Sequence, residues 1–146
     1  MQIGELAKRG GCDAETIRYY EREGLLPAPA RSASGYRRYE QAHLEQLAFI
    51  RHCRSLAMSL ADIRRLLAYH QHPSPAPCDD INALLDAQIG RIHQQIASLQ
   101  RLEQQLLTLR ARCDAPHTVA DCGILKTLEG AASGEGCVCH DAPSRD

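Results

Sequence analysis

The sequence has few aromatic residues and no long apolar run. Tryptophan is absent and phenylalanine occurs once, so one large hydrophobic core is not expected in these 146 residues. No apolar segment approaches the roughly 20 residues that a membrane-spanning helix requires. The opening MQIGELAKRGG lacks the apolar stretch of a secretory signal peptide. We therefore expect a cytoplasmic protein with no membrane partner.

Enzymatic signatures are lacking too. No nucleophile–base arrangement and no cofactor motif occurs in the sequence, so an enzyme is not expected. A disulfide framework is disfavoured because the seven cysteines are odd in number and widely spaced, and because a reducing cytosol opposes one. Two interpretations of the cysteines remain open at this point: buried free thiols, or ligands of a soft metal ion.

Charge is unevenly distributed, although the net charge is only -1. Residues 1–75 contain eleven Lys and Arg against eight Asp and Glu, a net of +3, whereas residues 76–146 contain six against ten, a net of -4. A basic N-terminal half suits contact with phosphate groups, but this small excess is a weak signal by itself.

The first part of the chain is predicted to form two short helices around a tight turn. Residues 3–9 have one apolar face and are followed by Gly10-Gly11, whose backbone freedom suits a turn. Asp13 is a favourable N-cap for the second helix, ETIRYYERE, which should end at Gly24. This pattern is typical of a helix-turn-helix.

The next segment, ARSASGYRRYE at residues 30–40, differs in kind. Ser34-Gly35 is a turn signal between two short arms, which indicates a two-stranded hairpin or wing. Helical periodicity returns from about Gln41, and Ser59-x-x-Asp62 predicts the start of another helix. We therefore expect a mainly α-helical chain in which residues 1–74 form a winged helix-turn-helix DNA-binding domain.

A proline-rich segment follows and ends this domain. Three prolines lie between positions 73 and 77, and proline ends a helix. Beyond them, a heptad-like pattern predicts one long helix over residues 78–112. Its narrow apolar stripe cannot be buried within so small a chain, so we expect a partner helix from a second copy and hence a homodimer. The stripe consists of Ile81, Leu85, Ile89, Ile92, Ile96, Leu99, Leu102, Leu106 and Leu109.

Donor side chains suited to DNA lie on the second helix and on the wing. Arginine and the hydroxyl groups of Thr and Tyr are donors that meet phosphates and base edges. The alternative is that one of the adjacent tyrosines packs in the core and that the arginines are merely solvated. The predicted DNA-contacting residues are Thr16, Arg18, Tyr19 and Tyr20 on the helix, and Tyr36, Arg37 and Arg38 on the wing. Tyr39, next to them, is expected to reach the flanking DNA backbone as well.

The stretch GELAKRGGCDAETIRYYEREGLLPAPARSASGYRRY closely resembles the N-terminal domain of the MerR family of transcriptional regulators. The resemblance continues through FIRHCRSLAMSLADIRRLL and the long helix and covers all but the final tail. It implies a dimer joined by an antiparallel coiled coil. It also implies promoter double-stranded DNA and RNA polymerase as partners, with activation by bending and untwisting a promoter whose spacer is too long.

Three cysteines match the metal loop of that family. Cys78 and Cys113 flank the long helix, and 35 positions at 1.5 Å rise separate them by roughly 50 Å. They cannot share an ion within one chain, but in an antiparallel dimer Cys78 of one protomer meets Cys113 and Cys122 of its partner. The alternative is that the three cysteines are unrelated. Residues 113–129 are thus predicted to form a metal-binding loop and a short helix.

The expected effector is a soft divalent ion. Three thiolates and no obligatory histidine favour Pb(II), Cd(II) or Hg(II), with Zn(II) as a harder competitor. Within the family, the Cys-x-x-x-Asn pattern at Cys78–Asn82, CGILKTLE and the CVC tail resemble the lead- and cadmium-responsive branch. Pb(II) suits three sulfur ligands, whereas Cd(II) would take a fourth ligand from His117, Asp79 or water. Pb(II) or Cd(II) is therefore the predicted effector, with Zn(II) or Hg(II) as the alternative.

The remaining cysteines and histidines fall into three groups. Cys12 and Cys53 are expected to be small structural residues, and His70 and His72 to be solvated residues of the linker. Residues 130–146 are small and polar and are expected to form a flexible tail. That tail contains a candidate second metal site, Cys137, Cys139 and His140.

Other functions fit the sequence less well. A metal-sequestering protein would concentrate its thiols at CxxC or CxC density, which only the tail does. A redox or iron–sulfur sensor of the same family would need four cysteines in the loop, where this chain has two. A drug-binding member would need a substantial C-terminal domain, and only 33 residues follow Cys113.

Overall fold

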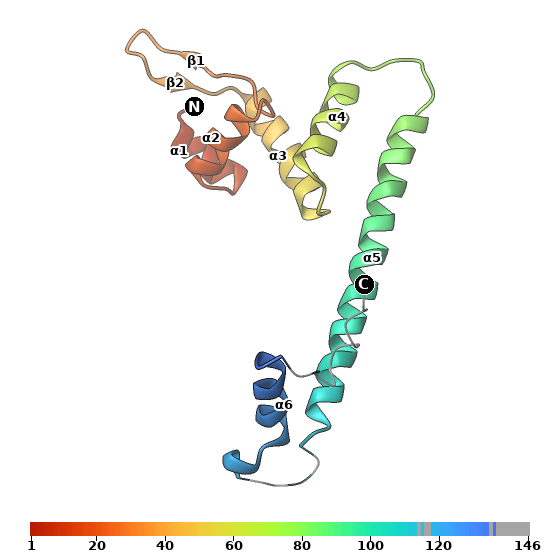
Figure 1. The fold of residues 1–146 in the computed structure, drawn as a ribbon. Helices are drawn as coiled ribbons and strands as arrows, with labels where there is room; N and C mark the ends of the chain where they lie inside the picture. The colour runs from red at the N-terminus through yellow and green to blue at the C-terminus, as the bar shows by residue number, and fades with distance from the viewer. Residues whose placement is uncertain (114, 116–117, 135, 137–146) are drawn as a thin grey trace. The chain divides into compact units, whose positions relative to one another are not determined.

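The computed structural model describes residues 1–113, 115, 118–134 and 136. This part of the chain is mainly helical, as predicted, and forms two compact units, Met1–Leu85 and Asp86–Asp146. Within it, no helix is both long and apolar enough to cross a membrane. The elements in chain order are α1 (Ile3–Gly10), α2 (Ala14–Arg22), β1 (Ala30–Arg31), β2 (Arg37–Arg38), α3 (Gln41–Ser55), α4 (Leu60–Gln71), α5 (Asp79–Arg110), the 3-10 helix η1 (Val119–Asp121) and α6 (Gly123–Ala132) (Figure 1).

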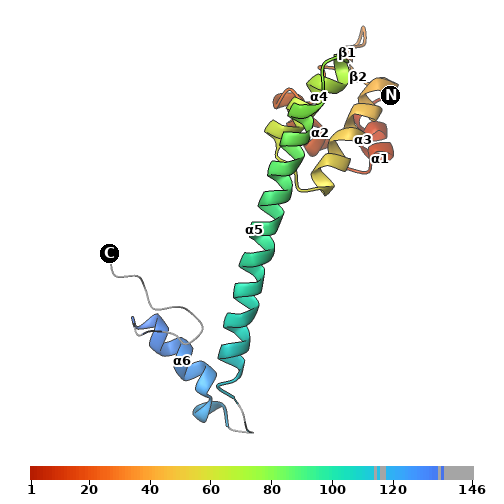
Figure 2. The ribbon, with the colours of Figure 1, turned by 90° about the vertical axis from the view of Figure 1, so that its right-hand side faces the viewer.

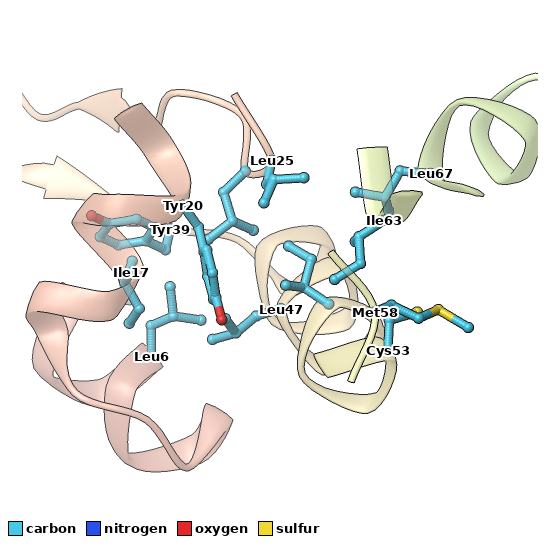
Figure 3. Packing of buried hydrophobic residues seen from close by; sticks show 12 residues of the cluster. Leu6, Ile17, Tyr20, Leu25, Tyr39, Leu47, Cys53, Met58, Ile63 and Leu67 are labelled. Carbon is cyan, nitrogen blue, oxygen red and sulfur yellow. The ribbon is translucent and has the colours of Figure 1, made fainter. Parts of the chain in front are cut away.

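The first unit contains one hydrophobic core, to which each of the helices α1 to α4 contributes (Figure 3). Capping residues set where the helices begin, because their side chains accept backbone N–H groups that the first turn leaves unpaired. Asp13 accepts from the Thr16 N–H at 2.7 Å, and Ser59 accepts from the Asp62 N–H at 3.1 Å, as expected. The most deeply buried core residues are Leu6, Ile17, Leu25, Tyr39, Leu47, Ile50 and Ile63.

The turn between α1 and α2 depends on two glycines. Gly11 has φ +63°, a left-handed conformation that favours glycine. Gly10 is buried where α1 packs on α3, and a side chain there would collide with Leu47. The predicted helix-turn-helix is therefore present, and the glycine pair both shapes its turn and allows α3 to approach.

The wing is an antiparallel hairpin with the register Ala30↔Arg38 and Arg31↔Arg37. Its tip reverses at Gly35, which has φ +83°. The tip is stabilised by Ser32, whose N–H donates to the Tyr36 carbonyl at 2.8 Å and whose Oγ accepts from the Tyr36 N–H at 3.1 Å. The hairpin lies where the turn signal predicted it.

Two of the predicted boundaries differ from the structure. The α4 helix extends to Gln71, so His70 is a helical residue whose ring stacks on Phe49 at 5.3 Å, and it is not part of the linker. The α6 helix extends to Ala132, so the predicted tail over residues 130–146 begins too early. In both cases the helix continues until the polar or glycine-rich segment that follows it.

The two cysteines outside the metal hypothesis are structural. Cys53 is 7 % exposed within the core, and Cys12 packs against that core. Burial raises the pKa of both thiols above the usual value, which disfavours the thiolate form. Both side chains therefore serve in packing of the first unit.

Candidate nucleic-acid interface and metal-binding cysteines

The α2 helix presents a polar face with several donors. Thr16 is half-buried, Arg18 retains 43 % of its side-chain exposure and Tyr19 is 41 % exposed. Arg22 lies one turn beyond Arg18, with its guanidinium carbon 6.0 Å from the centre of the Tyr19 ring. These side chains form a continuous group along one helix, as a recognition helix requires.

The adjacent tyrosine, Tyr20, does not belong to this face. It is only 7 % exposed and packs in the core with Leu6, Ile17 and Leu47 (Figure 3). Its prediction as a DNA contact is corrected for this reason. Tyr20 lies three residues after the buried Ile17 and therefore on the same helix face, whereas Tyr19 is rotated outward. The helical period could have separated the two tyrosines from sequence.

Carboxylates compete for the arginines of α2. The two oxygens of Glu15 lie 3.5 Å from the guanidinium groups of Arg18 and Arg22. These groups are well exposed, so the ion pairs stabilise the fold little and would exchange readily for phosphate contacts. Glu15 therefore orients Arg18 and Arg22, while both guanidinium groups remain exposed to solvent.

The wing supplies the second group of donors. Tyr36 is 67 % exposed, and Arg37 and Arg38 are exposed as well. Arg31, which was not among the predicted contacts, pairs with Arg37 across the hairpin and is exposed, and its guanidinium donates to the Gly35 carbonyl at 3.0 Å. The antiparallel pairing places Arg31 beside the predicted residues. Arg31 could therefore have been predicted from the sequence once the hairpin was recognised.

Tyr39 holds the wing against α2 and does not face solvent. It is 2 % exposed, its hydroxyl donates to Glu21 Oε1 at 2.6 Å, and Arg37 lies 3.8 Å from Glu21 Oε2. The backbone of Tyr39 also exchanges two hydrogen bonds with that of Met1, at 2.7 and 2.8 Å. The suggestion that Tyr39 reaches the DNA backbone is therefore wrong.

Cys78 is exposed and directly precedes α5. Its carbonyl accepts the Asn82 N–H at 3.0 Å, and the Asn82 side-chain amide donates to its Sγ at 3.8 Å. Cys78 is thus accessible, attached to the first turn of the helix, and provided with one donor to its sulfur. Asp79, a candidate fourth ligand, is the next residue.

Cys113 and Cys122 lie in the second unit, on either side of η1, and both are half-buried. The Arg110 guanidinium donates to the Cys113 carbonyl at 2.6 Å, and the Cys122 carbonyl accepts the Lys126 N–H at 3.1 Å. Each cysteine is therefore fixed to the end of a helix: Cys113 follows α5 and Cys122 begins α6.

A glycine allows these two helix ends to approach. A Cβ at Gly123 would lie 2.8 Å from the carbonyl oxygen of Arg112, closer than real Cβ contacts. The residue after Cys122 therefore packs against the residue before Cys113. Both views of the ribbon show α6 beside the C-terminal end of α5 (Figure 1, Figure 2).

The three cysteines do not form a cluster within one chain. Among the residues that the structure describes, no group of three or more His, Cys, Asp and Glu could hold a metal ion. The candidate ligands His117, Cys137, Cys139 and His140 lie outside those residues. Thiolates are the donors that soft ions select, so the residue types fit such an ion.

The surface of α5 provides a reason for a second chain. Large apolar side chains along this helix are exposed in a single protomer, which is unusual for a surface of this extent. They include Leu85, Ile89, Ile96, Leu99, Leu102, Leu106 and Leu107, at 39 to 64 % exposure.

A helix-turn-helix with a basic wing, joined to a long helix with an exposed apolar stripe, defines a DNA-binding transcriptional regulator. The chain belongs to the MerR family of such regulators, which are not enzymes. Residues 1–70 match the family of MerR HTH family regulatory proteins, and residues 44–109 match the family described as MerR, DNA binding.

Individual relatives extend this finding to most of the chain. The lead(II) complex of the transcription regulator PbrR691 from Ralstonia metallidurans CH34 is 45 % identical, with a TM-score of 0.75 over 88 % of this chain and 98 % of that one. The mercuric resistance operon regulatory protein of Bacillus cereus is 39 % identical over 88 % of this chain and 96 % of its own. HiNmlR, a MerR family regulator solved on promoter DNA, is 26 % identical, with a TM-score of 0.52 over 92 % and 91 % of the two chains.

Proposed function

We propose that this protein is a metal-responsive regulator that binds promoter DNA as a homodimer and activates heavy-metal resistance genes on binding Pb(II) or Cd(II). The observation that carries the proposal is the arrangement around α5. Its apolar stripe is exposed, and thiols lie directly before its first residue and shortly after its last. One assembly, an antiparallel pair of such helices, covers the stripe and brings the thiols together.

The DNA-binding surface consists of the outward face of α2 and the wing. The residues in it are Thr16, Arg18, Tyr19, Tyr36, Arg37 and Arg38, to which we add Arg31 because it pairs with Arg37 across the hairpin. Arginines that neutralise phosphates release counterions, so affinity for DNA should fall steeply with salt. Replacing Arg38 by alanine should weaken binding to all sequences alike and reduce the salt slope by about one. Arg101 on α5 serves as the matched control.

The metal site in this proposal is shared between protomers. Cys78 of one chain and Cys113 with Cys122 of its partner provide three thiolates for one ion, so a dimer has two equivalent sites. A bound ion would join the two ends of the paired helices and thereby constrain how the DNA-binding units are spaced. Because bending a site of this size costs on the order of 1–6 kcal/mol, a modest effector-linked bias suffices to favour a distorted promoter that RNA polymerase recognises.

The identity of the ion rests on the donor set and on similarity. Three sulfur ligands suit Pb(II), and the similar PbrR691 was solved with lead(II). The mercury-resistance relative keeps Hg(II) as an alternative effector, and Zn(II) is a harder competitor. Metal sequestration as the primary role is not favoured, because it gives no purpose to a recognition helix and a wing.

A promoter-reporter titration tests the proposal. Reporter expression is measured against Pb(II), Cd(II), Zn(II), Hg(II) and Cu(I), in the wild type and in Cys78→Ser, Cys113→Ser and Cys122→Ser. Each variant should lose induction and keep its affinity for promoter DNA. Cys53→Ser is the matched control and should still respond. Metal response in all three single variants would refute the site.

Mixed dimers test the sharing of ligands. Co-expressed Cys78→Ser and Cys113→Ser chains can rebuild one complete site in a heterodimer, because each supplies what the other lacks. Partial recovery of induction is expected in the mixture and none in either variant alone. Failure to recover, with heterodimers shown to form, would contradict a site bridging the protomers.

A further inference from the structure

The described segment between α4 and α5 has no regular backbone hydrogen bonding. Residues 72–78 contain prolines at 73, 75 and 77, which lack the N–H group needed for a regular hydrogen-bond ladder. The hydrogen bond found inside the segment is local, from the Ala76 N–H to Ser74 Oγ at 3.1 Å. A side-chain contact across this segment would therefore join the first turn of α5 to α4 directly.

A side-chain hydrogen bond crosses this segment. The Tyr69 hydroxyl on α4 donates to Asp80 Oδ2 on the first turn of α5 at 3.0 Å, and both residues belong to the compact unit Met1–Leu85. The bond to Asp80 is the main cause that raises the pKa of Tyr69 above its ordinary value. A hydrogen bond to a charged acceptor is among the stronger ones.

Each end of this bond is attached to a functional part. On the α5 side, Asp80 shares the first helical turn with Cys78, whose carbonyl accepts the Asn82 N–H at 3.0 Å. On the other side, Ile63 and Leu67 anchor α4 in the core. Arg64 of α4 donates to the carbonyl of Glu23, directly after the last residue of α2, at 2.6 Å.

We infer that Tyr69 and Asp80 form a latch that couples the metal-binding cysteine Cys78 to the recognition helix α2. A displacement of Cys78 moves the first turn of α5, the latch transfers it to α4, and the bond from Arg64 to Glu23 passes it to the end of α2. Tyr69 is a positioning residue in this scheme: it contacts neither the ion nor DNA. The inference rests on the proposed function, because it explains how the proposed metal site acts.

A double-mutant cycle tests the latch. Tyr69→Phe keeps the ring and removes the donor, and Asp80→Ala removes the acceptor. Each single variant should reduce metal-dependent induction about fivefold, on the scale of one lost hydrogen bond between exposed side chains. Metal affinity and metal-free DNA affinity should stay within about twofold of wild type. The double variant should be no worse than either single one, because all three lack the same bond.

Two outcomes overturn the latch. One is full induction in Tyr69→Phe, and the other is a double variant whose loss equals the two single losses combined. Asp86→Ala, a matched loss of a carboxylate on the same helix, should induce normally. A variant with weaker metal binding in proportion to its lost induction would place Asp80 at the ion and also refute the latch.

A metal-free measurement separates this inference from the proposed function. Hydrogen exchange of the amides from residue 69 to residue 82 should be faster in Tyr69→Phe than in wild type, without any ion present. If the wild type responds to no metal, the proposed function fails, and unchanged exchange in the variant then refutes the latch independently. A responsive wild type together with a responsive Tyr69→Phe refutes the latch alone.

Discussion

The Tyr39 hydroxyl lies 2.6 Å from Glu21 Oε1 and joins the end of the wing to the recognition helix. Both groups are largely withdrawn from water: Tyr39 is 2 % exposed and the Glu21 side chain 13 %. Arg37 pairs with the second oxygen of Glu21 at 3.8 Å. One carboxylate thus fixes the wing relative to α2, so the two predicted DNA-contacting groups are presented as a single surface.

Removing this hydroxyl should destabilise the N-terminal unit. In Tyr39→Phe a buried carboxylate loses its hydrogen-bond donor, which costs about 1.5–3 kcal/mol of the free energy of unfolding. Urea unfolding followed by circular dichroism measures the loss. The control is Tyr36→Phe, whose side chain is 67 % exposed and should change stability by less than about 0.5 kcal/mol. Equal stabilities for the two variants would contradict a role for the bond to Glu21.

The same bond predicts a dependence on alkaline pH. Burial, and next the bond to Glu21, raise the pKa of Tyr39 above its ordinary value of 10.0. A raised pKa in the folded state means that the stabilisation is complete below pH 10 and is lost as pH rises above it. The advantage of wild type over Tyr39→Phe should therefore shrink by about 1.4 kcal/mol for each pH unit above 10. Urea unfolding of both proteins between about pH 8 and pH 11 measures it, and a constant difference would contradict the shift.

Local signals predicted the helical elements of the first unit well. Asp13 and Ser59 each cap the start of a helix. A side-chain acceptor directly before a segment with helical apolar periodicity marks a helix start in the sequence. Contacts between segments that are far apart in the sequence leave no comparable local pattern. The bond from Tyr39 to Glu21 depends on how the wing packs on α2, and the composition of either segment would fit several packings. Tyr39 was for this reason expected to reach the DNA backbone rather than to be buried.

The candidate metal-binding cysteines, Cys78, Cys113 and Cys122, show the same division between what the sequence predicts and what it does not. The positions of Cys78 and Cys113 at the two ends of one long helix predicted a site that a single chain cannot complete, and that site remains a prediction. The sequence did not reveal how Cys113 and Cys122 are brought near each other. That depends on the close approach at Gly123. Glycine also occurs at the start of helices that make no close contact there. The presence of Gly123 in the sequence therefore does not predict a contact.

A side chain at Gly123 should disturb the metal-binding loop. In Gly123→Ala the added Cβ would lie 2.8 Å from the Arg112 carbonyl, so α6 must shift away from the end of α5. Under the proposed function, the affinity for Pb(II) should fall about tenfold or more, the cost of overpacking by 1–3 kcal/mol. Titration followed by sulfur-to-metal charge-transfer absorbance measures the affinity.

Gly90→Ala is the matched control, because a Cβ there meets nothing within 4 Å. Gly90→Ala is also a glycine-to-alanine change within a helix. It should stabilise α5 by up to about 1 kcal/mol without weakening metal binding. If both glycine variants bind Pb(II) like the wild type, the contact between Gly123 and Arg112 does not position the loop.

A charge in the apolar stripe of α5 should separate the protomers. Leu99 is 64 % exposed in one chain, so Leu99→Glu costs an isolated protomer little. In a paired helix the same change removes about 1.5–3 kcal/mol of apolar burial per chain and places a charge in a dry interface. Because each dimer contains two copies, the dissociation constant should rise at least about 100-fold. Sedimentation velocity across a concentration series measures it. Gln94→Glu adds the same charge outside the predicted stripe and should remain dimeric. A Leu99→Glu protein that sediments as wild type would exclude this stripe as the dimer interface, and with it the meeting of Cys78 and Cys113 across the dimer.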